Sequence, residues 1–89
     1  MQSIDIVVTN KLGLHARAAA KLTQLAAKFV SDINISRDSQ RVNAKSIMGV
    51  MMLAAGMGVT VTVDAEGLDE EDALREIQAL FADRFGEPD

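Results

Sequence analysis

The chain contains no cysteine and only one histidine. Without cysteine it can form no disulfide framework, no thiol nucleophile and no cysteine-based zinc site. One histidine is also too few for a three-histidine metal centre. We therefore expect a protein with neither a bound metal nor a cofactor.

Aromatic residues and long apolar runs are also scarce. The only aromatic residues are three phenylalanines, so the core must be built from Ala, Val, Ile, Leu and Met. No apolar run approaches the roughly 18 residues that a membrane span needs. The first five residues, Met1–Asp5, lack the basic start and apolar stretch of a signal peptide. These features predict a cytoplasmic chain without membrane insertion.

Acidic residues outnumber basic ones: the chain has thirteen Asp and Glu and nine Lys and Arg, which gives a net charge of −4. A nucleic-acid binder that relies on phosphate contacts normally has the opposite balance, so we expect no nucleic-acid partner. The chain is 25% charged and 48% hydrophobic, which is typical of a globular protein rather than a disordered one. Its 89 residues are enough for one small domain, over 1–89.

Hydrophobic periodicity predicts seven elements in the order β-α-β-β-α-β-α. Alternating apolar and polar residues predict strands at Ile4–Val8, Ile33–Ile35, Arg41–Asn43 and Val59–Ala65. A period near 3.6 predicts helices at Ala16–Phe29, Ser46–Ala55 and Asp69–Phe85. Four amphipathic strands need cover on one face, so the pattern predicts an open-faced α+β sandwich with helices on one side of the sheet.

Both ends of the last predicted helix carry specific expectations. The acidic run Asp69–Asp72 lies in the first turn, where carboxylates complement the helix dipole and cap free N–H groups. The tail beyond the helix, Gly86–Asp89, is expected to fray.

His15 is the residue most suggestive of chemistry, because it stands at the predicted start of a helix. Unpaired N–H groups and a partial positive charge make a helix N-terminus an anion site. The same field disfavours a protonated imidazole, so a neutral ring nitrogen is available as a nucleophile. Arg17 can add a charge-assisted contact to a bound phosphoryl group. A lone histidine at a helix start is more often a plain polar surface residue, so the spacing alone leaves both interpretations open.

Two segments resemble one known family. Residues 13–19 read GLHARAA, which closely resembles the active-site segment of the HPr family, the histidine-containing phosphocarriers of the bacterial phosphoenolpyruvate–sugar phosphotransferase system. Residues 42–53 read VNAKSIMGVMML and resemble that family's regulatory-serine segment. The separation of the two segments, the chain length and the predicted element order also match, so the resemblance covers essentially the whole chain.

The resemblance implies a phosphoryl relay rather than a turnover enzyme. Enzyme I would pass a phosphoryl group from phosphoenolpyruvate to Nδ1 of His15, with Arg17 contacting the group. His15 would then donate it to an enzyme IIA during sugar uptake. The implied fold is an antiparallel four-stranded sheet covered on one face by three helices. One residue departs from the family pattern, because Ala18 stands where proline is common. Alanine there restores one N–H donor and leaves the nucleophile in place.

Ser46 precedes a predicted helix, so it is expected to serve as an N-cap. The resemblance also implies regulation, since some family members are phosphorylated at this serine by an ATP-dependent HPr kinase/phosphorylase. A phosphate at a helix N-terminus is compatible with the fold, and its charge would repel an acidic partner.

The helix after Ser46 is too short to bury all of its apolar residues. By the resemblance, enzyme I and enzyme IIA would dock on residues from both of the first two helices: Ala16, Arg17, Ala20, Ile47, Met48 and Met51. Methionine suits a surface that meets several partners. Met52 and Leu53 are expected to fill the core.

Three other functions compete with that of a sugar-branch carrier. A carrier of the paralogous nitrogen-regulatory phosphorelay would use the same histidine, although the Ser46 segment favours the sugar branch. A non-catalytic docking module would leave His15 incidental. A small hydrolase is disfavoured because no carboxylate lies near His15 in sequence to act as a general base. A carrier that docks transiently is most simply a monomer.

Overall fold

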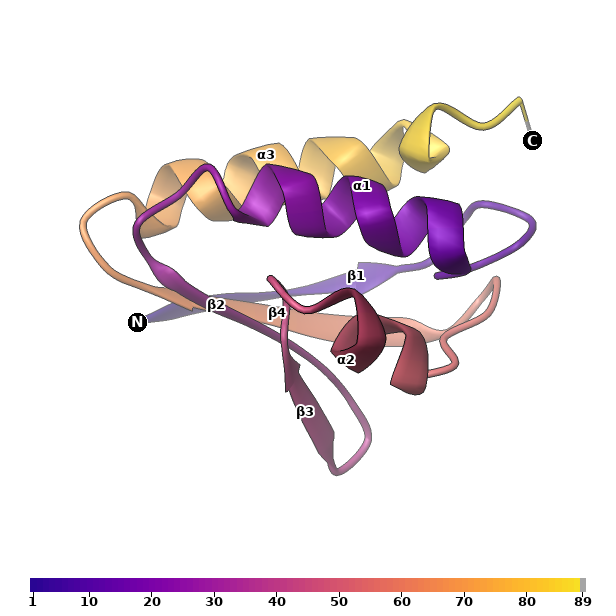
Figure 1. The fold of residues 1–89 in the computed structure, drawn as a ribbon, viewed down its shortest axis with the longest axis horizontal. Helices are drawn as coiled ribbons and strands as arrows, with labels where there is room; N and C mark the ends of the chain where they lie inside the picture. The colour runs from indigo at the N-terminus through magenta and orange to yellow at the C-terminus, as the bar shows by residue number, and fades with distance from the viewer. Residues whose placement is uncertain (89) are drawn as a thin grey trace.

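The computed structural model describes residues 1–88 and contains a four-stranded antiparallel sheet (Figure 1). The strands are β1 (Gln2–Val7), β2 (Asp32–Arg37), β3 (Gln40–Asn43) and β4 (Thr60–Glu66). Their order across the sheet is β1-β4-β2-β3, and every neighbouring pair is antiparallel. All four strands lie where the alternating pattern predicted them.

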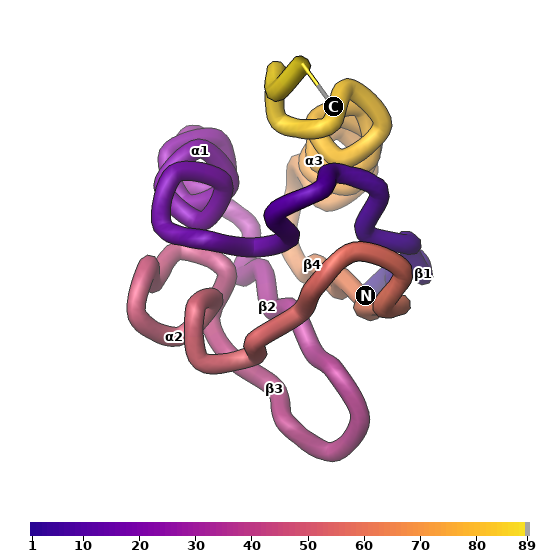
Figure 2. The backbone as a smooth tube through the Cα atoms, turned by 90° about the vertical axis from the view of Figure 1, so that its right-hand side faces the viewer, coloured from indigo at the N-terminus to yellow at the C-terminus, as the bar shows by residue number. Residues whose placement is uncertain are grey.

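Three helices accompany the sheet: α1 (Ala16–Ala26), α2 (Ile47–Met52) and α3 (Glu70–Ala82), with a short 3₁₀ turn at Arg84–Gly86. Figure 2 shows α1 and α3 side by side above the sheet, with the shorter α2 below α1 and next to β3. The predicted α+β sandwich, a sheet with its helices on one side, is confirmed.

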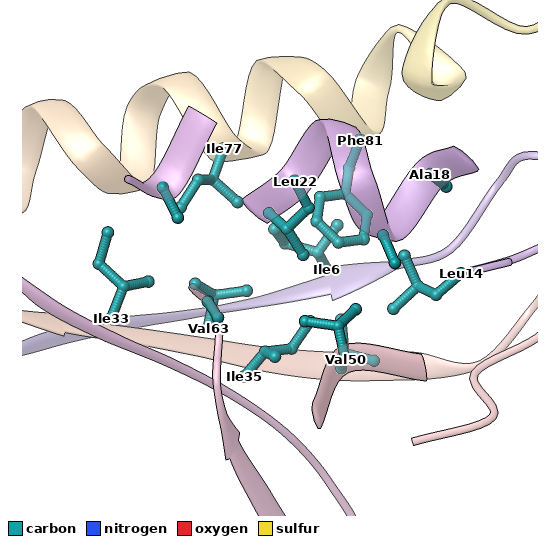
Figure 3. Close-up of a cluster of buried hydrophobic side chains, with 14 of the residues drawn as sticks. Ile6, Leu14, Ala18, Leu22, Ile33, Ile35, Val50, Val63, Ile77 and Phe81 are labelled. Carbon is teal, nitrogen blue, oxygen red and sulfur yellow. The ribbon is translucent and has the colours of Figure 1, made fainter. Parts of the chain in front are cut away.

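The core lies between the sheet and the helices. Strand pairing places Ile6 opposite Val61 and Ile35 opposite Val63, so the apolar residues of neighbouring strands point to the same face. Figure 3 shows side chains from α1 and α3 packed onto this face. The largest side chains that are fully buried include Leu22, Ile33, Ile77, Phe81 and Phe85.

All three helices are shorter than the periodicity predicted. Helix α1 ends at Ala26, and the next residues form tight turns in which Phe29 N–H donates to the Ala26 carbonyl. Helix α2 ends at Met52 because Ala54 adopts a left-handed φ of 51°. Helix α3 ends at Ala82 rather than Phe85, since Phe85 has a φ of 57°. Apolar periodicity continues beyond each helix because the turns that follow also contribute buried residues.

Asp69 stands at the N-cap of α3 but does not cap it, which corrects the expectation for this residue. Its carboxylate instead accepts hydrogen bonds from the backbone N–H groups of Val30 and Ser31 and from the Ser31 hydroxyl. Asp69 therefore ties the start of α3 to the connection between α1 and β2.

Within residues 1–88 no helix has the length and apolar character needed to cross a membrane.

Candidate functional site

His15 is the N-cap of α1, with an extended backbone (φ −72°, ψ 178°). Its Nδ1 accepts a hydrogen bond from the backbone N–H of Arg17 at 3.3 Å. The first backbone hydrogen bond of the helix runs from the Ala19 N–H to the His15 carbonyl oxygen. The N–H groups of the preceding turn therefore have no partner within the helix. His15 therefore stands at the start of the helix, as predicted, and its Nδ1 lies at the end where N–H groups can bind an anion.

The loop before His15 fixes the position of the ring. Gly13 has a φ of +67°, and a side-chain carbon there would lie only 2.5 Å from the Ala55 carbonyl oxygen. Leu14 is buried and its N–H donates to that carbonyl oxygen at 2.9 Å. The Asn10 side chain adds a 2.7 Å bond to the Gly13 carbonyl. These contacts join the loop to the segment after α2.

A carboxylate contacts the other ring nitrogen. Glu87 Oε2 lies 2.6 Å from His15 Nε2, in a side chain that is only 11% exposed. The hydrogen bond with His15 is the main cause that lowers the pKa of Glu87 below its usual range, and contributions from Asn10 and Lys21 act in the same direction. The expectation of a frayed tail is wrong for Glu87, and Asp89 lies outside the described residues.

Two further residues hold the tail over the site. Asn10 Nδ2 donates to Glu87 Oε1 at 3.2 Å, and Lys21 Nζ donates to the Phe85 carbonyl. Figure 2 shows the tail passing above the loop that joins β1 to α1. No carboxylate lies near His15 in sequence, but the fold brings Glu87, which is 72 residues away along the chain, into contact with the ring.

A surface cavity of about 600 Å³ opens beside His15. Its walls come from the β1–α1 loop, the first turn of α1 and the tail: Lys11, Leu12, His15, Ala16, Arg17, Glu87 and Pro88. Arg17 is exposed, and within residues 1–88 its guanidinium forms no hydrogen bond or ion pair. The guanidinium is thus available to an incoming anion. The same residues contain no cluster of three or more side chains suited to holding a metal ion.

Ser46 is the N-cap of α2, as predicted. Its Oγ accepts a hydrogen bond from Gly49 N–H at 3.1 Å, and the residue is half-buried. Like His15, it has an extended backbone, with φ −112° and ψ 113°.

The residues predicted to dock partners are accessible. Ile47, Met48 and Met51 are 42%, 71% and 40% exposed on α2. On α1, Ala16 and Arg17 are exposed and Ala20 is half-buried. Helix α1 packs against α2, so the two groups belong to one region of the molecule (Figure 2).

The expectation for the end of α2 is half right. Leu53 is buried, but Met52 is 65% exposed and does not fill the core. A six-residue helix presents only one narrow face to the sheet, and Val50 occupies that face.

The sequence is similar to known phosphocarriers along nearly its whole length. A family model described as the PTS HPr component phosphorylation site matches residues 2–83. A phosphocarrier protein HPr from Cupriavidus necator is 61% identical over 83 residues, which cover 93% of each chain.

Solved structures agree with the sequence comparison. A crystal structure of HPr from Thermoanaerobacter tengcongensis has a TM-score of 0.95 and 47% identity, and the match covers 98% of both chains. A crystal structure of an HPr dimer from the same organism has a TM-score of 0.79 and covers 98% of this chain and 100% of that one. Because sequence and fold agree over nearly the whole length, this chain belongs to the HPr family, the phosphocarriers of the phosphotransferase system.

Proposed function

We propose that His15 accepts a phosphoryl group from phospho-enzyme I, derived from phosphoenolpyruvate, and passes it to an enzyme IIA during sugar uptake. The observation that carries this proposal is the position of Nδ1, which accepts the Arg17 N–H at the open end of α1. A nitrogen that accepts a hydrogen bond keeps its lone pair and can act as a nucleophile.

The transfer step follows from this geometry. The Nδ1 lone pair attacks phosphorus, the N–P bond forms, and the bond between phosphorus and the donor breaks with its electron pair going to the donor. The phosphoryl oxygens would then accept hydrogen bonds from the N–H groups of the first turn of α1. These include the Arg17 N–H, which loses its acceptor when the Nδ1 lone pair forms the N–P bond. The Arg17 guanidinium can approach the same oxygens from the cavity. Transfer to enzyme IIA is the same step in reverse, with a new acceptor.

The partners would dock beside the cavity. Exposed apolar residues of α2 (Ile47, Met48 and Met51) and accessible residues of α1 (Ala16, Arg17 and Ala20) would form a common surface for enzyme I and enzyme IIA. An HPr kinase/phosphorylase acting on Ser46 would place about −1.5 to −2 charges next to this surface. That charge would repel a partner with an acidic face.

The decisive experiment is intact-mass spectrometry after incubation with phosphoenolpyruvate, magnesium and a bacterial enzyme I, with half of each sample acidified. One added phosphoryl group that disappears in acid is the expected result, and it should be absent from His15→Ala. Arg17→Ala should still form the adduct, but more slowly. An adduct that persists in His15→Ala would refute the assignment, and no adduct from several enzyme I sources would favour a docking module.

Two finer points belong to the same proposal. Transfer to a sugar-specific rather than a nitrogen-branch enzyme IIA is expected, and a preference for the nitrogen-branch protein would reassign the branch. The chain is proposed to act in the cytoplasm as a monomer. Sedimentation of the purified protein tests the monomer, with the dimeric relative from Thermoanaerobacter tengcongensis as the comparison.

A further inference from the structure

We propose that Glu87 is a positioning residue for phosphoryl transfer: its carboxylate holds the His15 ring with the proton on Nε2, which leaves Nδ1 as the nucleophile. This inference rests on the proposed function of His15. Glu87 lies outside residues 2–83, the segment that matches the family model. The match therefore says nothing about this residue.

The two contacts of the ring are satisfied together by one protonation state. An ionised carboxylate only accepts hydrogen bonds, so Glu87 at 2.6 Å requires a proton on Nε2. A backbone amide only donates, so the Arg17 N–H at 3.3 Å requires a lone pair on Nδ1. Both conditions hold in the neutral ring protonated at Nε2. A proton on Nδ1 would point at the Arg17 N–H and is disfavoured.

The same carboxylate acts on the charge that develops during the reaction. When Nδ1 forms its bond to phosphorus, the ring acquires positive charge, and the proton on Nε2 stays shared with Glu87. A carboxylate at the nitrogen opposite the new bond stabilises that charge without occupying the phosphoryl position. When the group moves on to the next acceptor, the electron pair of the N–P bond returns to Nδ1, and the ring is again neutral.

The backbone conformation of the tail places this carboxylate beside His15. Arg84 and Phe85 both adopt left-handed backbone conformations, with φ of 56° and 57°, which are unfavourable for residues with side chains. Such a turn persists only where surrounding contacts impose it. Phe85 is buried in edge-to-face contact with Phe81, at 4.8 Å between ring centroids.

Polar contacts complete the placement of the carboxylate. Lys21 of α1 holds the Phe85 carbonyl, and the buried Asn10 side chain joins the second Glu87 oxygen to the Gly13 carbonyl. One amide group thus connects the carboxylate to the loop that orients His15. The surrounding contacts therefore hold Glu87 in position against His15.

The test compares Glu87→Ala with Glu87→Gln and with Glu76→Ala. Glu76 is an exposed residue of α3, so its variant removes the same charge away from the site. The amide introduced by Glu87→Gln keeps an oxygen that can accept from Nε2–H.

The first readout is the NMR spectrum of the His15 ring nitrogens and the Nε2–H proton, recorded above the pH range in which imidazole is protonated. His15 is the only histidine, so its signals need no assignment by mutation. In the unmodified protein and in Glu76→Ala, we expect a downfield, slowly exchanging Nε2–H and an unprotonated Nδ1. In Glu87→Ala the Nε2–H signal should be lost to exchange with water, and Glu87→Gln should restore it.

The second readout is the rate of phosphoryl transfer from phospho-enzyme I. Loss of one hydrogen bond to the ring predicts a rate roughly 5- to 10-fold lower in Glu87→Ala, with partial recovery in Glu87→Gln. Unchanged ring signals in Glu87→Ala, or altered signals with an unchanged rate, overturn the role of Glu87. The unmodified protein keeps the function of His15 and the role of Glu87 distinguishable. Failure to phosphorylate the unmodified protein would refute the function of His15, but it would not refute the hydrogen bond between Glu87 and His15.

Discussion

At the scale of single residues, the site depends on backbone conformation as much as on side chains. Gly13 is the clearest case, since its positive φ and its closeness to the Ala55 carbonyl leave no room for a side chain. This backbone conformation directs Leu14 into the core and places His15 at the start of α1. A glycine two residues before His15 is therefore a structural requirement of the candidate site.

We expect Gly13→Ala to destabilise the protein by about 1–3 kcal/mol, because alanine would be strained at this φ and would collide with the Ala55 backbone. Denaturant-induced unfolding measures the change. Gly56→Ala is the matched control, since a side-chain carbon there would contact nothing within 4 Å. Equal stability of the two variants would contradict the steric argument.

Substitutions of Ser46 can separate its role as the N-cap of α2 from the effect of a negative charge at this position. Ser46→Ala removes the acceptor for Gly49 N–H and should cost about 1 kcal/mol of stability. Ser46→Asn and Ser46→Asp both keep a capping oxygen, so both should remain close to the unmodified protein in thermal unfolding. Only Ser46→Asp adds charge, and only it should weaken binding to enzyme I. Equal binding by the Asn and Asp variants would argue against regulation through charge.

At the scale of elements, α2 shows how a short helix can leave an apolar surface uncovered. Its buried face consists of Val50, while three neighbouring methionines are at least 40% exposed. Helix α1 lies directly beside it and has His15 as its N-cap. An apolar surface next to the proposed phosphoryl acceptor suits partners that bind, exchange a phosphoryl group and dissociate.

Replacing Met48 by alanine should therefore weaken binding to enzyme I by roughly tenfold, which corresponds to a moderate hot spot. Stability should change by no more than about 0.5 kcal/mol, because Met48 is 71% exposed. Binding is measured by calorimetry with enzyme I. Leu68→Ala is the control, since Leu68 is fully exposed between β4 and α3, at the far end of β4 from α2. A similar loss of affinity in both variants would remove α2 from the docking surface.

The elements were predictable because their signals are local. Alternation in Val59–Ala65 and the apolar stripe of the last helix each follow from a repeat within a few residues. The ends of the helices were not predictable in this way. The left-handed turns at Ala54 and at Phe85 use residues with no special preference for that conformation, so tertiary packing imposes them.

The same division applies to the site. His15 at the helix start and Ser46 as a cap are local features, and both were predicted from the residues next to them. The roles of Glu87 and Asn10 were missed because the contacts of Glu87 with His15 and Asn10 join segments more than 70 residues apart. A polar tail after a helix carries no local signal for docking, and only the folded arrangement of α1 and α3 brings it to the histidine.

At the scale of the whole molecule, carboxylates tie both ends of α3 to α1 and its flanking segments. Glu87, beyond the end of α3, contacts the N-cap of α1. Asp69, before its start, holds the connection that follows α1. The two helices lie side by side over the sheet (Figure 1), so these links fix the helical layer at both ends. A layer held in this way keeps His15, the proposed nucleophile, in place while partners bind and dissociate.

Acid should weaken the carboxylate links between α3 and the segments that flank α1, and the link made by Asp69 allows this to be tested. The hydrogen bond from the Ser31 hydroxyl, followed by that from Val30 N–H, lowers the pKa of Asp69 below its ordinary value. A carboxyl whose pKa is lower in the folded state stabilises the fold fully above the unfolded-state pKa of about 4. That stabilisation is lost as the pH falls through the lower folded-state pKa.

We therefore expect Asp69→Asn to lower the melting temperature at about pH 7, because the amide keeps only one accepting oxygen for three donors. The difference from the unmodified protein should narrow as the pH falls below the ordinary range of aspartate, since acid removes the charge that the variant already lacks. Thermal unfolding followed by circular dichroism across this range measures both effects. Asp38→Asn, at an exposed turn, removes the same charge and should leave the melting temperature nearly unchanged at every pH. A difference for Asp69→Asn that stays constant with pH would show that its ionisation does not stabilise the fold.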